Sequence, residues 1–115
     1  MANGIASAIE GLEKENANLQ PELLSAERAR ELMAAYSKAE KLVAFGIAAL
    51  SRKLNEEEVA RVTGSSVARA KTVIETGRVM AACEELSSAM QHGDVSLDQA
   101  AAIASAEQSA PGAAR

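Results

Sequence analysis

Residues 55–74, NEEEVARVTGSSVARAKTVI, decide the fold of this 115-residue chain. Asn55 stands three residues before Glu58, and this spacing of a capping side chain and a glutamate marks the start of a helix. Gly64 then ends that short helix, because glycine readily adopts the left-handed conformation that closes a helix. One of the two serines that follow caps a second helix. Two helices joined by a tight glycine turn are typical of a helix-turn-helix or of a simple helical hairpin.

A long helical pattern precedes this stretch, over residues 26–53. Its apolar residues recur at steps of four and three, which is the spacing of one helix face; they are Leu32, Tyr36, Ala39, Val43, Ile47, Leu50 and Leu54. Gly46 in its middle costs roughly 1 kcal/mol relative to alanine, and a close helix crossing there would explain it. We expect this helix to form the spine of the fold, with the other helices folded against it.

Three further helical patterns complete the chain. Residues 1–20 carry isoleucine and leucine on one helix face, and Pro21 ends that pattern. A second pattern stops at Gly93, and a third begins at the capping box of residues 96–99. No stretch shows the alternation of a strand. We therefore predict an all-α fold of about five helices, one of them long and central, with a helix-turn-helix-like pair around Gly64.

These patterns divide the chain into an N-terminal helix over residues 1–20, a helical domain over residues 21–108, and a flexible tail or truncation point over residues 109–115. Alanine supplies 26 of the 115 residues, whereas aromatic residues make up 2%. Small side chains bury little area each, so the core should be thin. A helical partner or a second copy of the chain would complete such a core.

The net charge of −4 disfavours nonspecific binding to the phosphate backbone of nucleic acids. Residues 52–78 are the exception, because they carry six basic and four acidic side chains. The chain has a single cysteine, no signal-peptide pattern and no apolar stretch long enough to span a membrane. We expect a cytoplasmic protein that makes no membrane contact.

Two residues invite a catalytic interpretation, and neither has the partners that it needs. His92 precedes Gly93 and Asp94, but a zinc or HNH-type site requires several convergent ligands. Cys83 has no base close to it in the sequence, so a small core residue is the better interpretation. Gly64 does not begin a phosphate-binding loop, because such a loop has more glycines and a lysine directly before Ser or Thr. We expect no enzymatic activity, no metal and no cofactor.

A DNA-binding helix-turn-helix presents the first residues of its second helix to the major groove. In this chain those residues are Ser66, Arg69, Lys71 and Thr72, which we take as candidate nucleic-acid contacts. The glutamates at residues 56–58 oppose this interpretation, because acidic side chains near a phosphate backbone are unfavourable. The alternative is a helical hairpin packed inside an all-α domain.

Two segments match a known sequence pattern. The first contains Thr63, Gly64, Ser66, Val67 and Ala70; the second, which is more specific, contains Gly93, Val95, Ser96, Gln99, Ala100, Ile103 and Ala104. Together they resemble the actinobacterial 13E12-repeat family, and in particular its N-terminal domain of unknown function 222, over roughly residues 25–114. The chain departs from the family at residues 81–84, where Ala-Ala-Cys-Glu replaces the usual Leu-Pro.

Members of that family often continue into a C-terminal HNH endonuclease domain, whose histidines and metal ligands this sequence lacks. The resemblance implies a non-catalytic accessory domain that associates with double-stranded DNA through the helix-turn-helix-like element. The residues alone leave a second hypothesis open. In it, the apolar face of residues 32–54 pairs with a helical partner or with a copy of itself, as an interaction or oligomerisation module without DNA binding.

Overall fold

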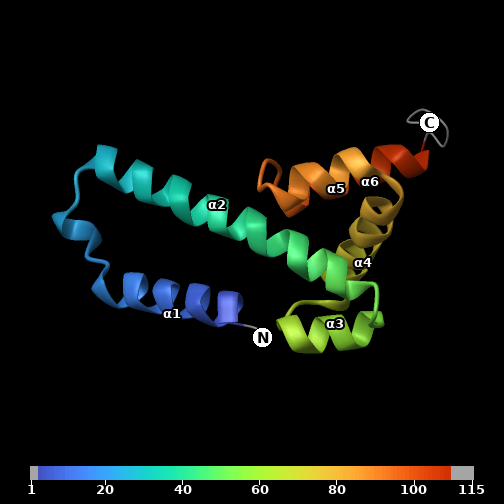
Figure 1. The fold of residues 1–115 in the computed structure, drawn as a ribbon, viewed down its shortest axis with the longest axis horizontal. Coiled ribbons are helices and arrows are strands. Elements are labelled where there is room, and N and C mark those ends of the chain that lie inside the picture. Colours follow the sequence, from blue (N-terminus) through green and yellow to red (C-terminus); the bar gives the residue numbers. More distant parts are fainter. Residues whose placement is uncertain (1–2, 110–115) are drawn as a thin grey trace. The chain divides into compact units, whose positions relative to one another are not determined.

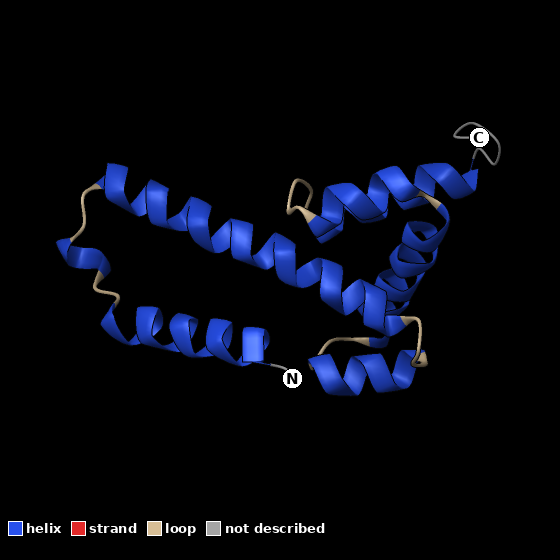
Figure 2. Ribbon diagram, viewed as in Figure 1, coloured by secondary structure: helices blue, strands red, loops and turns tan. Residues whose placement is uncertain are grey.

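A computed structural model describes residues 3–109, and every regular element in that range is a helix (Figure 2). The predicted all-α fold is confirmed, with six α-helices in the described range instead of about five. They are α1 (Asn3–Asn18), α2 (Ala26–Ser51), α3 (Glu56–Thr63), α4 (Val67–Ala82), α5 (Glu84–Gln91) and α6 (Leu97–Ser109), with a short 3-10 helix η1 (Pro21–Leu23) before α2. Residues 110–115 of the predicted tail lie outside the described residues.

The chain divides into two compact units, residues 1–34 and residues 35–115. In the first unit, α1 exposes Ile5 and Ile9, which are 66% and 52% accessible. Ser25 fixes the start of α2, because the backbone N–H of Arg28 donates to Ser25 Oγ at 3.0 Å. The second unit holds most of α2 and helices α3 to α6.

Helix α4 organises the second unit, because it contacts α3, α5 and α6 (Figure 1). Two core clusters form around it. The first contains Ala48, Met80, Leu86, Met90 and Ala100, and the second contains Val59, Ala70, Val73 and Ile74. Three of these nine residues are alanine, whose small side chain buries little apolar area. The core is thin, in the way that the composition predicts.

The long helix is present, but its most apolar face is not the buried one. The core positions of α2 are the buried Ala48 and Ser51, with Ala44, Phe45 and Ala49 half-buried beside the core. Val43, Ile47 and Leu50 of the predicted stripe are 51%, 38% and 70% exposed. Helix α2 therefore packs through Phe45 and several small side chains and leaves its larger aliphatic residues at the surface.

The close helix crossing lies at Gly77 and not at Gly46. A Cβ atom at position 77 would overlap the carbonyl oxygen of Ala48 and would come within 3.1 Å of Ser51 Oγ. The Ser51 hydroxyl donates to Ala48 O at 2.6 Å, so this buried polar group has a partner. A Cβ atom at position 46 would meet no atom within 4 Å. The expectation of an internal crossing at Gly46 is therefore wrong, because that side of α2 faces open space.

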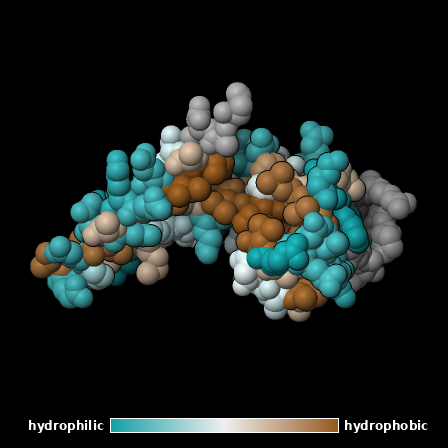
Figure 3. Space-filling model, turned by 90° about the horizontal axis from the view of Figure 1, so that it is seen from below, coloured by the Kyte–Doolittle hydropathy of each residue, from teal (hydrophilic) through white to brown (hydrophobic). Residues whose placement is uncertain are grey.

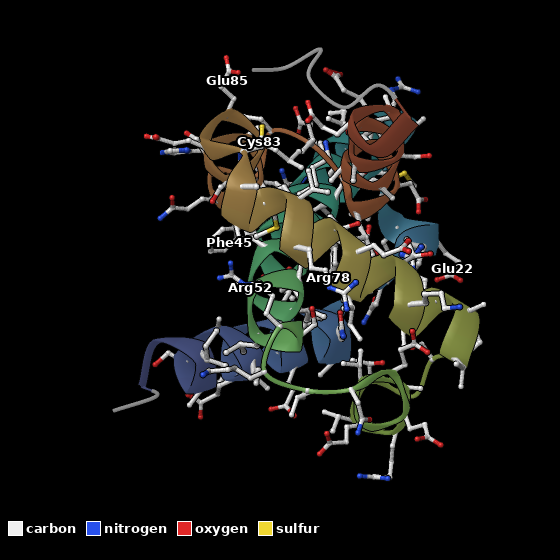
Figure 4. The ribbon with its side chains drawn as sticks, turned by 90° about the vertical axis from the view of Figure 1, so that its right-hand side faces the viewer. Glu22, Phe45, Arg52, Arg78, Cys83 and Glu85 are labelled. Atoms are coloured by element: carbon white, nitrogen blue, oxygen red, sulfur yellow. The ribbon has the colours of Figure 1, made fainter. Side chains whose placement is uncertain are left out.

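A bend at Cys83 accounts for the sixth helix. The backbone of Cys83 is extended, with φ −127° and ψ 102°, so one predicted helix becomes α4 and α5, which meet at this residue (Figure 4). The Cys83 carbonyl accepts from the Ser87 N–H at 3.1 Å, and α5 therefore starts directly after the bend. The change of direction brings Leu86 and Met90 of α5 into the same cluster as Met80 of α4.

Candidate functional site

The turn between α3 and α4 has the geometry that the sequence predicts. Asn55 Oδ1 accepts from the Glu58 N–H at 2.8 Å, and Glu58 Oε1 accepts from the Asn55 N–H at 3.2 Å, which completes the capping box. Gly64 is left-handed, with φ 72°, and the Ser65 N–H donates to Ala60 O at 3.0 Å. Helices α3 and α4 then cross steeply (Figure 1). The pair is helix-turn-helix-like in its local structure.

The four candidate nucleic-acid residues lie at the start of α4, where two of them, Ser66 and Thr72, form hydrogen bonds within the helix itself. Ser66 is the N-cap, because its Oγ accepts from the Arg69 N–H at 3.0 Å. Thr72 is half-buried, and its hydroxyl donates to Ala68 O at 3.3 Å. Lys71 is exposed, and no ion pair among the described residues engages its ammonium group. Lys71 is the candidate that is most available to a ligand.

Arg69 forms an ion pair with Asp98 of α6. The distance between Arg69 Nη1 and Asp98 Oδ1 is 3.0 Å, and the two side chains are 46% and 83% exposed. Exposed pairs of this kind contribute about 0–1 kcal/mol to stability. The pair nevertheless offsets the positive charge that Arg69 would offer to a phosphate. No local pattern predicts it, because 29 positions separate the two residues.

A groove of about 380 Å³ lies beside this ion pair, within the second unit. It is bounded by α2, by the α3–α4 turn and by the first residues of α6. Its lining is mostly apolar and includes Val43 and Ile47 of α2, Val73 of α4 and Leu97 of α6. The lining also contains four charged residues of both signs, Glu40, Lys41, Arg69 and Asp98, and uncharged polar residues such as Ser65 and Ser96.

An exposed aliphatic face on α2 adjoins the groove and shares two residues with it. We give the name aliphatic face to Val43, Ile47, Leu50 and Leu54, which are 51%, 38%, 70% and 39% exposed. Val43, Ile47 and Leu50 are spaced by four and three and share one side of α2, and Leu54 follows in the turn after the helix, which ends at Ser51. Apolar side chains reach the molecular surface in the space-filling view (Figure 3). The groove and the aliphatic face together form the candidate site.

One further basic residue of α4, Arg78, was not among the residues predicted from the sequence to contact nucleic acid. Arg78 is exposed on the outer side of this helix (Figure 4). It follows Lys71 by seven residues, which is close to two helical turns, so both residues belong to the same face. That spacing could have identified Arg78 from the sequence. Glu75 lies between them and lowers the net charge of the face.

His92 and Asp94 lie where α5 ends. His92 Nδ1 lies 2.7 Å from the carbonyl oxygen of Ser88. Lys38 of α2 donates through Nζ to His92 O at 2.6 Å and to Gly93 O at 3.3 Å, and it lies 3.9 Å from Asp94 Oδ1. Lys38 thereby holds the turn that follows α5, whose own carbonyls at Ser88, Ala89 and Met90 already accept from backbone N–H groups. The contacts around His92 are those of a helix terminus.

Comparison with family models, with curated proteins and with solved structures finds no match for this chain. The resemblance to the 13E12-repeat family therefore stays a prediction. In residues 3–109 no helix is both long enough and apolar enough to cross a membrane.

Proposed function

We propose that this chain is a helical protein–protein interaction module that binds its partner through the aliphatic face of α2 and the adjoining groove. One observation carries the proposal: Val43 and Leu50 are 51% and 70% exposed, while the buried positions of the same helix hold Ala48 and Ser51. Full burial of a valine or leucine stabilises a fold by about 1.5–3 kcal/mol. A row of such residues outside a thin core is typical of a surface that another molecule covers.

The groove can accept the side chains of a partner helix. Amphipathic helices bind by placing apolar residues, spaced three and four apart, into a groove lined by apolar side chains. The volume of about 380 Å³ lies within the range of roughly 300–1,000 Å³ that is typical of binding pockets. The charged residues of both signs in its lining can fix the orientation of a bound helix.

Substitution of Leu50 tests whether the aliphatic face is free in the monomer. Leu50→Lys should change the free energy of unfolding by less than about 0.5 kcal/mol, because the side chain is already exposed. Leu86→Lys is the matched control in a buried position and should cost more than about 4 kcal/mol. Urea unfolding followed by circular dichroism, at the lowest workable protein concentration, measures both. A loss of about 2 kcal/mol in Leu50→Lys would show that the monomer itself buries this face, and the proposal would fail.

The α3–α4 turn supports a second candidate function, association with double-stranded DNA. The specific observation is the left-handed Gly64 followed by the Ser66 cap, which begins a helix with exposed Lys71 and Arg78 on one face. Under this candidate the chain would be the non-catalytic accessory domain of an HNH-endonuclease-like protein, as the family resemblance implies. The pairing of Arg69 with Asp98 weakens the candidate relative to the interaction module.

Two substitutions test DNA association in opposite directions. Lys71→Ala should lower the affinity for a duplex and reduce the slope of its salt dependence by about one. Asp98→Asn should raise the affinity, because it releases Arg69 to contact phosphate. Glu85→Gln, which removes one negative charge from α5, is the control for net charge alone. Fluorescence anisotropy with a labelled duplex measures the affinities of all three variants. If the unsubstituted protein binds no duplex at about 50 mM salt, this candidate function is excluded.

A further inference from the structure

We propose that the aliphatic face binds a second copy of this chain, with the two α2 helices antiparallel and a two-fold axis beside Gly46 and Ile47. The inference rests on the proposed interaction function and names its partner. An interface with two-fold symmetry uses the same patch on both copies, so the patch must be complementary to itself. The aliphatic face of α2 meets this requirement in its side-chain sizes and in the charges at its two ends.

Antiparallel alignment brings residues of suitable size level with one another. When the axis lies between positions 46 and 47, Val43 of one copy is level with Leu50 of the other. The two copies of Ile47 lie next to each other at the axis. Because the arrangement is symmetric, the contact between Val43 and Leu50 occurs twice. Three layers of aliphatic side chains then form one continuous seam.

Gly46 gives the reason to place the axis at this point. A glycine in the middle of a helix costs about 1 kcal/mol relative to alanine, and no contact within the chain makes use of it, since a Cβ atom there would meet nothing within 4 Å. Gly46 lies beside the aliphatic face, three residues after Val43 and one before Ile47. The absence of a side chain lets a second backbone approach closely, and we infer that this is its role.

The charges at the ends of the face agree with the antiparallel direction. Residues 42–51 contain no charged side chain; the exposed Glu40 of α2 precedes this segment, and the exposed Lys53 follows it in the turn after α2. In the antiparallel pair Glu40 of one copy is level with Lys53 of the other, whereas a parallel pair would set like charges side by side at both ends. Lys41 and Arg52 lie about half a turn away from the face, and Lys41 belongs to the lining of the groove. Charge complementarity therefore favours a second copy in this direction.

The groove adjoins the same part of α2 and would be covered in the pair. Its α2 lining spans residues 37–47. The residues of the other copy that are level with this span include Leu50, which is 70% exposed in the single chain. Each copy would therefore place Leu50 at the groove of its partner.

The seam is small, and this sets the expected affinity. A standard interface covers about 800 Å² on each partner. Four aliphatic residues reach that size only together with the groove and its charged residues. We expect reversible dimerisation with a dissociation constant on the order of micromolar.

Disulfide trapping tests the direction of the pair. In a Cys83→Ala background, Ile47→Cys places two thiols beside the axis, where the Cα atoms can come within the roughly 5.5–6 Å that a disulfide requires. Mild oxidation should therefore give a covalent dimer. Ala39→Cys is the matched control, because antiparallel pairing separates the two copies of this residue by about 22 Å. Trapping through Ala39→Cys, or its absence through Ile47→Cys, would contradict the proposed arrangement.

Sedimentation equilibrium of the full chain tests the seam itself. Val43→Asp should weaken dimerisation at least ten-fold, because it sets a carboxylate against Leu50 of the other copy. Val67→Asp is the matched control: this valine is also 51% exposed but belongs to α4, and its substitution should leave the affinity unchanged. Gly46→Leu should weaken the dimer as well, although the monomer has room for the side chain.

The outcomes separate this inference from the proposed function. If the unsubstituted protein stays monomeric far above micromolar concentration, a second copy is not its partner. If Leu50→Lys also leaves the stability of that monomer unchanged, the interaction function stands and another protein is its partner. If Leu50→Lys destabilises the monomer, both proposals fail. Equal weakening of a dimer by Val43→Asp and Val67→Asp would place the interface elsewhere and overturn the seam.

Discussion

At the scale of single residues, Gly46 and Gly77 show that one residue type can serve two different purposes. Both occupy the interior of a helix, where glycine costs about 1 kcal/mol relative to alanine. At Gly77 the backbone of Ala48 fills the space that a Cβ atom would need, so the core requires glycine there. At Gly46 the same space is empty, and the monomer gains nothing from the missing side chain.

Alanine at the two positions should therefore have opposite effects on the monomer. Gly46→Ala should raise the free energy of unfolding by about 1 kcal/mol, through helix propensity alone. Gly77→Ala should lower it by about 2 kcal/mol, because a carbonyl oxygen in the packed crossing cannot move aside as a flexible side chain could. Urea unfolding, at a protein concentration below the dissociation constant of the dimer, measures both free energies. Equal effects of the two substitutions would contradict the assignment of the crossing to Gly77.

At the scale of helices, α5 is short, and a side chain from α2 supports its end. Lys38 donates to the carbonyl oxygens of His92 and Gly93, which follow the last turn of α5. The ion pair with Asp94 adds little, since the two side chains are 52% and 65% exposed. The hydrogen bonds to the helix end are therefore the stabilising part of this contact.

Removal of that lysine should loosen α5. Lys38→Met keeps the length of the side chain and its helix propensity but loses the donated hydrogen bonds, and it should lower the free energy of unfolding by about 1 kcal/mol. Lys14→Met in α1, which is also an exposed lysine on a helix, should have no comparable effect. Thermal unfolding of both variants provides the comparison, and amide exchange should become faster in α5 of Lys38→Met. Unchanged exchange there would argue against a capping role for Lys38.

At the scale of the whole molecule, the sequence predicted most of the helices and their ends. The capping box of Asn55 and Glu58 is present, and so is that of Ser96 and Gln99, whose side chains exchange hydrogen bonds with each other's backbone at 2.8 and 3.0 Å. The left-handed Gly64 and the long α2 also agree with the sequence. The bend at Cys83 was not predicted, because the helical periodicity continues across it and neither proline nor glycine marks it.

The candidate site was predicted only in part. Val43, Ile47 and Leu50 were identified as one face of a helix, but the sequence left open whether this face packs inside the fold or stays free for a partner. Periodicity shows which residues share a face, and it contains no information about what covers that face. Ser66, Arg69, Lys71 and Thr72 stay predicted DNA contacts, and the partner of Arg69 became visible only when α6 was placed beside α4.

The sequence by itself determined the helical class, the helix starts and the turn at Gly64, because caps and glycine turns depend on residues three to five positions apart. Only the tertiary structure decided that α2 packs through Ala48 and Ser51 and leaves its aliphatic face outside. The physical reason is the close crossing at Gly77, where backbone meets backbone and larger side chains would not fit. Contacts between residues so distant in sequence leave no local pattern, yet they determine which apolar residues remain for a partner.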